Sequence, residues 1–128
     1  MDKQLKSAAA WFEIPCADLD RAQRFYETIL GCRMKKDDFG TVDDVMCVFP
    51  AGPGSVAGAL VKRPFQSPSS VGTMVYLNCD GELDGVIGRV PGAGGSILMR
   101  RTPVPGGFGS FACLRDSEGN HVGLHTSI

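Results

Sequence analysis

Glu13 could perform acid–base chemistry if the strand face on which it lies is shielded from water. Residues 10–15 are rich in aromatic and β-branched types, which predicts a strand with Trp11 and Glu13 on the same face. A carboxylate on a shielded strand face suits a general base, so Glu13 is the catalytic candidate. The alternative is that Glu13 forms an ion pair with Arg100 or Arg101, or lies in water at a dimer edge.

The two histidines, His121 and His125, lie on one face of a predicted strand near the end of the sequence. Four residues of strand span roughly 13 Å, whereas two ligands of one metal ion lie within about 3 to 4 Å of each other. The two histidines therefore cannot both bind the same ion. We expect His121 to be solvated and His125 to make a hydrogen bond in a cleft or interface, where it would contact a ligand.

The five cysteines do not predict a disulfide framework or a zinc site. They are widely spaced and form no C-x-x-C pair: Cys16, Cys32, Cys47, Cys79 and Cys113. We interpret them as reduced and mostly buried. A reactive thiol, which needs a basic or helix N-terminal setting, is the alternative.

The composition favours one globular domain that handles small molecules. The sequence has 128 residues, of which 43% are hydrophobic and 21% charged. A net charge of -1 and a pI of about 6.1 give no reason to expect a nucleic acid or an anionic membrane as partner. No apolar run approaches the roughly 20 residues of a membrane helix and no signal peptide is apparent, so a cytoplasmic location is expected.

A helix is the clearest element of the first half. Asp18 suits an N-cap and Gly31 can take the left-handed conformation that ends a helix. The apolar residues between them recur at helical spacing: Leu19, Ala22, Phe25, Tyr26, Ile29 and Leu30. Strands are predicted at 10–15, near Met34, at 45–49 and at 56–61, with a Pro- and Gly-rich turn between the last two. The order of elements is β-α-β-β-β.

The second half repeats the first at a spacing of 63 residues, so that Phe12 and Ile14 correspond to Val75 and Leu77. After one inserted residue, Gly31 aligns with Gly95. A second helix is expected from an apolar stripe, although two glycines and one proline weaken it. The apolar stripe consists of Leu83, Val86, Ile87 and Val90. The residues that weaken the helix are Gly85, Gly88 and Pro91.

Three further strands are predicted at 96–99, 109–114 and 120–125. The Gly-rich loop 103–109 is interpreted as a mobile edge or lid. We expect a single domain over residues 1–128, made of module 8–62 and module 72–127 joined by linker 63–71.

Four stretches taken together are similar to one known family. They are 12–15 (FEIP) with 18–31, then 72–78 (GTMVYLN), the helix end Gly94-Gly95, and 116–125 (DSEGNHVGLH). In order and coverage they resemble the vicinal-oxygen-chelate (VOC) superfamily of glyoxalases, bleomycin resistance proteins and dioxygenases.

The resemblance implies an α+β fold in which paired βαβββ modules form a curved mixed sheet around a cleft. In such proteins a divalent metal usually binds one side chain from each of four strands. Its open positions accept two oxygens of the substrate, and the ion stabilises developing enolate charge.

The four ligand positions of the family fall on Trp11, a residue within 58–60, Met74 and Gly123. Indole cannot ligate a divalent ion, a thioether suits a hard cation poorly, and glycine has no donor side chain. We therefore predict that the metal ligands are missing and that no cofactor is bound. A divalent metal enters only in an alternative with rearranged ligands.

The family fold places Trp11, Met74 and Tyr76 on the cleft side of their strands. These side chains would form an apolar wall that, with His125, binds a flat or apolar ligand, while Glu13 supplies polarity. The competing interpretation is that they only fill the cavity left by the missing metal.

Three functions remain open on this sequence. The leading hypothesis is a glyoxalase- and bleomycin-resistance-like protein that binds or transforms a small molecule without the metal tetrad. The first alternative is a metal-dependent lyase or isomerase with rearranged ligands such as Glu13 and His125. The second is a non-catalytic structural or regulatory dimer module. By analogy with the family, a homodimer is expected.

Overall fold

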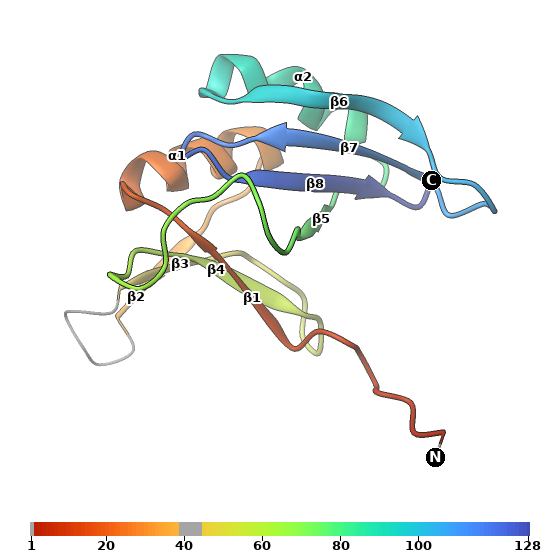
Figure 1. Ribbon diagram of the computed structural model, residues 1–128, viewed down its shortest axis with the longest axis horizontal. Helices are drawn as coiled ribbons and strands as arrows, with labels where there is room; N and C mark the ends of the chain where they lie inside the picture. The colour runs from red at the N-terminus through yellow and green to blue at the C-terminus, as the bar shows by residue number, and fades with distance from the viewer. Residues whose placement is uncertain (1, 39–44) are drawn as a thin grey trace.

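The strands form two mixed four-stranded sheets in the computed structural model, which describes residues 2–38 and 45–128 (Figure 1). The first half contributes β1 (Trp11–Pro15), α1 (Leu19–Leu30), β2 (Lys35–Asp37), β3 (Met46–Val48) and β4 (Ala57–Val61). The second half contributes β5 (Tyr76–Asn78), α2 (Leu83–Ala93), β6 (Ser96–Pro103), β7 (Ser110–Arg115) and β8 (His121–Thr126). The predicted α+β fold with two β-α-β-β-β units is confirmed.

The two sheets share one topology. Their strand orders are β1-β4-β3-β2 and β5-β8-β7-β6. In the first sheet β1 pairs in parallel with β4, and in the second β5 pairs in parallel with β8. The remaining pairs are antiparallel. The parallel pairs β1–β4 and β5–β8 therefore lie at corresponding places in the two halves, as the repeat predicts.

Helix α1 begins and ends as the sequence predicts. The Asp18 carboxylate accepts a hydrogen bond from the Arg21 N–H at 3.0 Å, and Gly31 takes a left-handed conformation with φ of 65°. Its N–H donates to the Glu27 carbonyl, which satisfies one of the last helical acceptors.

Helix α2 ends one residue before the predicted position. The left-handed residue is Gly94, with φ of 108°, whereas the repeat had aligned Gly95 with Gly31. Gly95 is needed for a different reason: a Cβ there would lie 2.6 Å from the Arg115 carbonyl oxygen and 2.7 Å from the Phe25 ring. Among the described residues, neither helix is long and apolar enough to cross a membrane.

One apolar core joins the two halves. Ile14 and Leu60 of the first sheet and Leu77 and Leu124 of the second are buried in the same cluster as residues of both helices. Helices α1 and α2 also contact each other. Full burial of each large apolar side chain contributes about 1.5 to 3 kcal/mol, so the halves stabilise each other mainly through this face.

The opposite face of each sheet, which we call its outer face, carries the residues of alternate parity. On the first sheet this face includes Trp11 and Glu13, which pair in register with Ala57 and Ala59. On the second it includes Tyr76, because its neighbour Leu77 is buried in the core. The predicted alternation of side chains along β1 and β5 is therefore observed.

An aromatic ring covers a glycine on each parallel strand pair. A Cβ on Gly58 would lie 2.5 Å from the Phe12 ring, and a Cβ on Gly123 would lie 2.3 Å from the Tyr76 ring. Gly123 is also the register partner of Tyr76 on β8. Both glycines are therefore required by close packing of a ring against the backbone.

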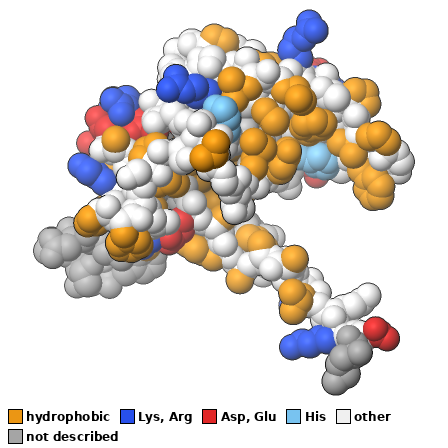
Figure 2. Space-filling model, viewed as in Figure 1, with side chains coloured by type: hydrophobic (Ala, Val, Ile, Leu, Met, Phe, Trp, Pro, Cys, Tyr) orange, Lys and Arg blue, Asp and Glu red, His pale blue; other side chains and the backbone are white. Residues whose placement is uncertain are grey.

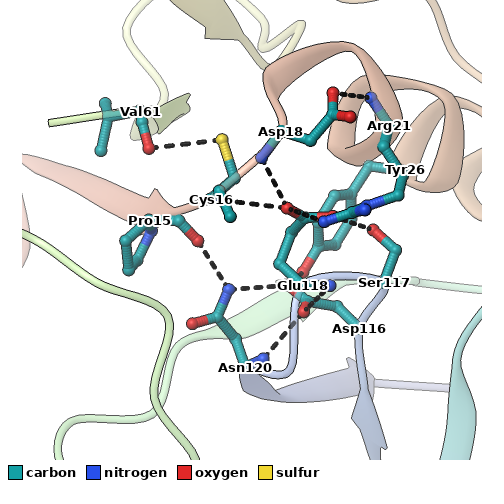
Figure 3. A network of polar contacts seen from close by, with 11 residues as sticks. Pro15, Cys16, Asp18, Arg21, Tyr26, Val61, Asp116, Ser117, Glu118 and Asn120 are labelled. Atoms are coloured by element: carbon teal, nitrogen blue, oxygen red, sulfur yellow. Dashed lines mark hydrogen bonds and ion pairs between the residues drawn. The ribbon is translucent and has the colours of Figure 1, made fainter.

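The turn between β7 and β8 fastens onto the beginning of α1 (Figure 3). The Glu118 carboxylate accepts hydrogen bonds from the Ala17 N–H at 3.0 Å and the Asp18 N–H at 2.8 Å. It also forms an ion pair with Arg21 at 2.6 Å, and its side chain is inaccessible to solvent. The carboxylate thus binds the N-terminal end of a helix that belongs to the other half of the chain.

The same contacts determine the pKa of Glu118. Burial alone would raise the pKa of this carboxyl, but the hydrogen bonds from Arg21, Asp18, Ser117 and Ala17 outweigh burial and lower it from 4.5 to about 2. The charged form is therefore stabilised in the folded protein.

A second carboxylate of the turn binds the middle of α1. Asp116 accepts a hydrogen bond from the buried Tyr26 hydroxyl at 2.6 Å and from the Asn120 amide at 3.0 Å. Burial, followed by the nearby Asp116 charge, raises the pKa of Tyr26 well above its ordinary value, so the phenol remains a donor. Together, Asp116 and Glu118 connect α1 with the β7–β8 turn.

We expect Glu118→Gln to lower the free energy of unfolding by about 2 kcal/mol at pH 7, because the charge-assisted bonds to α1 are lost. A group with a lowered pKa stabilises the fold above its ordinary value of 4.5, and this contribution is lost as the pH falls toward 2. The difference between the parent and the variant should therefore shrink over that range in urea titrations. Asp20→Asn, which removes an exposed first-turn charge of α1 and its ion pair with Lys36, is the control and should change stability much less. A constant difference from pH 7 to pH 2 would contradict the assignment.

We expect Gly123→Ala to destabilise the fold by about 1 to 3 kcal/mol, because the new Cβ overlaps the Tyr76 ring. In a Tyr76→Ala background the same substitution should cost much less, and thermal unfolding of the four proteins measures this coupling. Gly88→Ala is the matched control: its Cβ meets no atom within 4 Å, and it should stabilise α2 by up to about 1 kcal/mol. Equal costs of Gly123→Ala in both backgrounds would show that the ring does not occupy this space.

Candidate functional site

A cavity of about 340 Å³ lies where β1 approaches the beginning of β8. Its walls come from three segments: β1, residues 120–122 at the beginning of β8 and just before it, and residues 69–75, which we call the strap. The outer-face residues Trp11 and Glu13 both line it. Its volume is at the small end of the range for ligand pockets, about 300 to 1,000 Å³.

Glu13 is held on both sides of its carboxylate. One oxygen is 2.6 Å from the Arg63 guanidinium, and the other accepts a hydrogen bond from the Trp11 indole N–H at 3.2 Å. The Glu13–Arg63 pair is largely shielded, with side chains 23% and 15% exposed. Because a carboxylate has about four acceptor positions, Glu13 can still accept a hydrogen bond from a ligand.

The ion-pair partner of Glu13 differs from those considered in the sequence. Arg101 instead pairs with Asp84 at 3.3 Å, at the far edge of the second sheet. Arg63, which follows β4, is brought to Glu13 by the parallel pairing of β1 with β4. Fifty residues separate the two partners, so no local pattern could have identified them.

Of the three residues expected to form one apolar wall, only Trp11 lines the cavity. Tyr76 lies on the outer face of the second sheet, 50% exposed, with its ring 6.2 Å from the Phe111 ring in an edge-to-face contact. Met74 precedes β5, is partly buried and does not line the cavity. The structure therefore does not bring Trp11, Met74 and Tyr76 together in one cavity.

The two histidines occupy different surroundings. His121, which was expected to be solvated, lines the cavity with Glu13. His125 lies further along β8, where its Nε2 is 2.7 Å from the Phe108 carbonyl oxygen. Since a carbonyl can only accept, Nε2 must carry the hydrogen in this contact. His125 thus fastens the Gly-rich loop to β8 and does not line the cavity.

Sequence reasoning missed the residues that the strap and β8 contribute to the cavity. They are Ser69, Val71, Thr73, Val75, Asn120 and Val122. The strap has no hydrophobic periodicity, so only its Ser and Gly residues and the Pro-containing segment before it were informative. Asn120 offered one signal, since it is a polar residue at the start of a predicted strand whose side chain must find partners if buried.

The residues at the family's metal-ligand positions do not fit a divalent ion. Ala59 is the residue of 58–60 that shares the outer face with Glu13, and it has no donor atom. At Gly123 the Tyr76 ring occupies the space that a ligand side chain would need. Across residues 2–38 and 45–128, no group of three or more His, Cys, Asp or Glu could hold a metal ion.

The cysteines do not supply a nucleophile to the cavity. All five are free thiols, and burial raises the pKa of Cys16 to about 12 and those of Cys47 and Cys79 to about 11. Burial also raises the pKa values of Cys32 and Cys113. Since the thiolate is the reactive form, these residues are protonated at neutral pH and unreactive.

Comparison with known proteins identifies the fold and its family. A family model described as the glyoxalase/bleomycin resistance protein/dioxygenase superfamily matches residues 8–124. No curated protein matches the chain.

Among solved structures, a glyoxalase I mutant from Zea mays has a TM-score of 0.68 and 22% identity, covering 92% of this chain and 45% of its own. This chain thus spans about half the length of that protein. A glyoxalase/bleomycin resistance protein/dioxygenase family enzyme from Burkholderia phytofirmans PsJN has a TM-score of 0.68 and 13% identity, and the match covers 93% of this chain and 98% of that protein. TnmS3, an antibiotic binding protein from Streptomyces sp. CB03234, has a TM-score of 0.65 and 21% identity, and the match covers 97% of this chain and 98% of that protein.

At these identities the solved structures establish the fold alone, whereas the family model covers almost the whole sequence. The chain belongs to the glyoxalase/bleomycin resistance protein/dioxygenase superfamily.

Proposed function

We propose that this protein binds a small flat or apolar molecule in the cavity between β1, the strap and β8, without the metal tetrad of its superfamily. The observation that carries the proposal is the placement of Trp11 and Glu13 in one cavity. An indole face contributes apolar contact area, and a fixed carboxylate supplies one oriented acceptor. Pockets for small molecules commonly combine these two features.

Binding is better supported than metal-assisted catalysis. The four positions at which the superfamily holds its metal offer an indole, an alanine, a thioether and a glycine covered by a ring. The rearranged pair of Glu13 and His125 also lacks support, because His125 does not line the cavity and is bonded to Phe108. TnmS3, a structural neighbour, is described as an antibiotic binding protein.

A second candidate function is acid–base conversion of the bound molecule. It is favoured by one observation, the presence of Glu13 and His121 in the same cavity. Against it, each Glu13 oxygen already accepts a hydrogen bond, one from the Trp11 indole and the other from the Arg63 guanidinium. Glu13 is thus better placed to orient a ligand than to remove a proton.

A structural or regulatory dimer module without a ligand is the remaining alternative. It would be favoured if the side chains of the cleft filled it completely. The cavity of about 340 Å³ beside Trp11 speaks against such filling.

Replacing Trp11 by alanine should weaken the binding of a ligand found in a thermal-shift screen by more than tenfold, about 1.4 kcal/mol, because the indole contact is lost. Glu13→Gln should change pH dependence or turnover more than affinity, since an amide still accepts a hydrogen bond but carries no charge. Tyr76→Ala, on an aromatic residue outside the cavity, is the matched control for isothermal titration. If Trp11→Ala and Glu13→Gln both bind the ligand and turn it over like the parent, the site lies elsewhere.

Elemental analysis of protein purified under mild conditions should find no stoichiometric divalent metal, because the tetrad positions lack donors. Crystals grown with nickel or zinc should show no ion held by protein groups inside the cavity. One bound ion per chain at this place would support the alternative of a metal-dependent lyase or isomerase.

We also propose that the protein forms a homodimer. The outer face of the second sheet carries exposed apolar side chains, among them Tyr76 and Met99, and Phe108 of the loop between β6 and β7 is exposed as well (Figure 2). Exposed apolar patches of this kind commonly mark interfaces. Light scattering at tens of micromolar should return twice the chain mass of 13.6 kDa, and a value equal to that mass would remove the proposal.

A further inference from the structure

One buried side chain holds all three walls of the cavity together. The Asn120 amide nitrogen donates to the Pro15 carbonyl of β1 at 2.7 Å and to Asp116 at 3.0 Å. Its oxygen accepts from the Ser69 N–H of the strap at 3.0 Å. Asn120 itself directly precedes β8 and is only 5% exposed. Its donors and its acceptor are therefore committed to three different segments.

Between its ends, the strap is held by little else. Beyond the Ser69 bond, Val75 accepts a hydrogen bond from the Gly123 N–H at 2.9 Å. Within the described chain, the other strap hydrogen bonds of residues 69–74 are the two between Ser69 and Val71, which are internal to it. The strap is thus attached at two points, with residues 70–74 spanning the gap. Segments with few such bonds open at low cost in free energy.

The strap presents an uncovered apolar side chain at the cavity. Val71 lines the cavity and is nevertheless 81% exposed. Thr73, also on the strap, adds a hydroxyl to the same wall. A molecule that fills the cavity and contacts both Trp11 and Val71 would remove the apolar surface of Val71 from water.

We infer that the strap is the selectivity-determining wall of the cavity, that Val71 is its ligand contact, and that Asn120 is the positioning residue that holds it in place. The inference builds on the proposed binding function and adds to it the residues that set which flat molecules fit. Asn120 acts through Ser69 and Pro15, so it need not touch the ligand itself. Its role differs from that of Glu118, whose bonds to α1 do not reach the strap.

The positioning role is tested without any ligand by hydrogen exchange of single amides. In the parent, the Ser69 amide should exchange at least tenfold more slowly than those of Gly72 and Thr73, because it is bonded to Asn120. Asn120→Ala should remove this protection and leave the β3 and β4 amides unchanged. Asn120→Asp keeps the acceptor oxygen but loses the donors to Pro15 and Asp116 and places a second carboxylate beside Asp116, so it should not restore the protection. Equal exchange of Ser69 and Gly72 in the parent would overturn the inference even if neither variant folds.

The selectivity role is tested with two probes that differ only in size, indole and carbazole, each of which has one N–H donor for Glu13. Val71→Ala should change the ratio of their dissociation constants at least fivefold without changing the unfolding temperature, because Val71 is exposed. Val56→Ala, outside the cavity, is the matched control. If the probes bind the parent but the ratio is unchanged by Val71→Ala, the inference is wrong. If neither probe binds the parent, the proposed function itself fails, while the exchange experiment still decides the role of Asn120.

Discussion

The β7–β8 turn is the contact on which the arrangement of the two halves depends. Each half is a complete β-α-β-β-β unit, and the apolar core between them is non-directional. The directional contacts between the halves come from the β7–β8 turn. There Glu118 binds the N-terminal end of α1, and Asp116 binds the Tyr26 hydroxyl (Figure 3). These bonds allow one orientation of the second half on α1. The next residue of the same network, Asn120, then orders the cavity walls.

The cavity follows from how two similar units meet. Each sheet packs one face on the common core, so the residues of alternate parity remain on outer faces. Trp11 and Glu13 thereby reach the junction of β1 with the start of β8, whereas Tyr76 stays on the exposed face of the second sheet. Corresponding positions of the repeat thus have different surroundings. Internal symmetry of sequence does not make the two halves equivalent at the site.

The outer faces also show how the place of a metal can be taken by packing. On the second sheet, the Tyr76 ring lies against Gly123, where a family ligand would project from β8. On the first sheet, Ala59 is fully buried beside Met46 and Val61 in a small apolar cluster. Charged ligands at either position would be costly to bury without an ion to pair with. The apolar residues at these positions therefore accompany the loss of the metal-ligating side chains.

The sequence by itself determined the elements whose signals are local. Asp18 and Gly31 predicted the ends of α1, the 63-residue repeat predicted the second unit, and strand parity predicted the outer-face positions of Trp11 and Glu13. Helical and strand periodicity arise from backbone geometry over a few residues, so they can be read without the fold. Residue type alone likewise showed that neither Trp11 nor Gly123 has a side-chain atom that could ligate a metal ion.

Only the tertiary structure decided which side chains meet. Arg63 and Glu13 are 50 residues apart, and Glu118 and Asp18 are 100 apart, and neither pair leaves a trace in local pattern. The separation of Tyr76 from Trp11, and the position of His121 in the cavity while His125 makes its hydrogen bond outside it, follow from how the sheets pack. Polar side chains select partners by geometry in three dimensions, and a buried group must be satisfied by whatever segment the fold brings near.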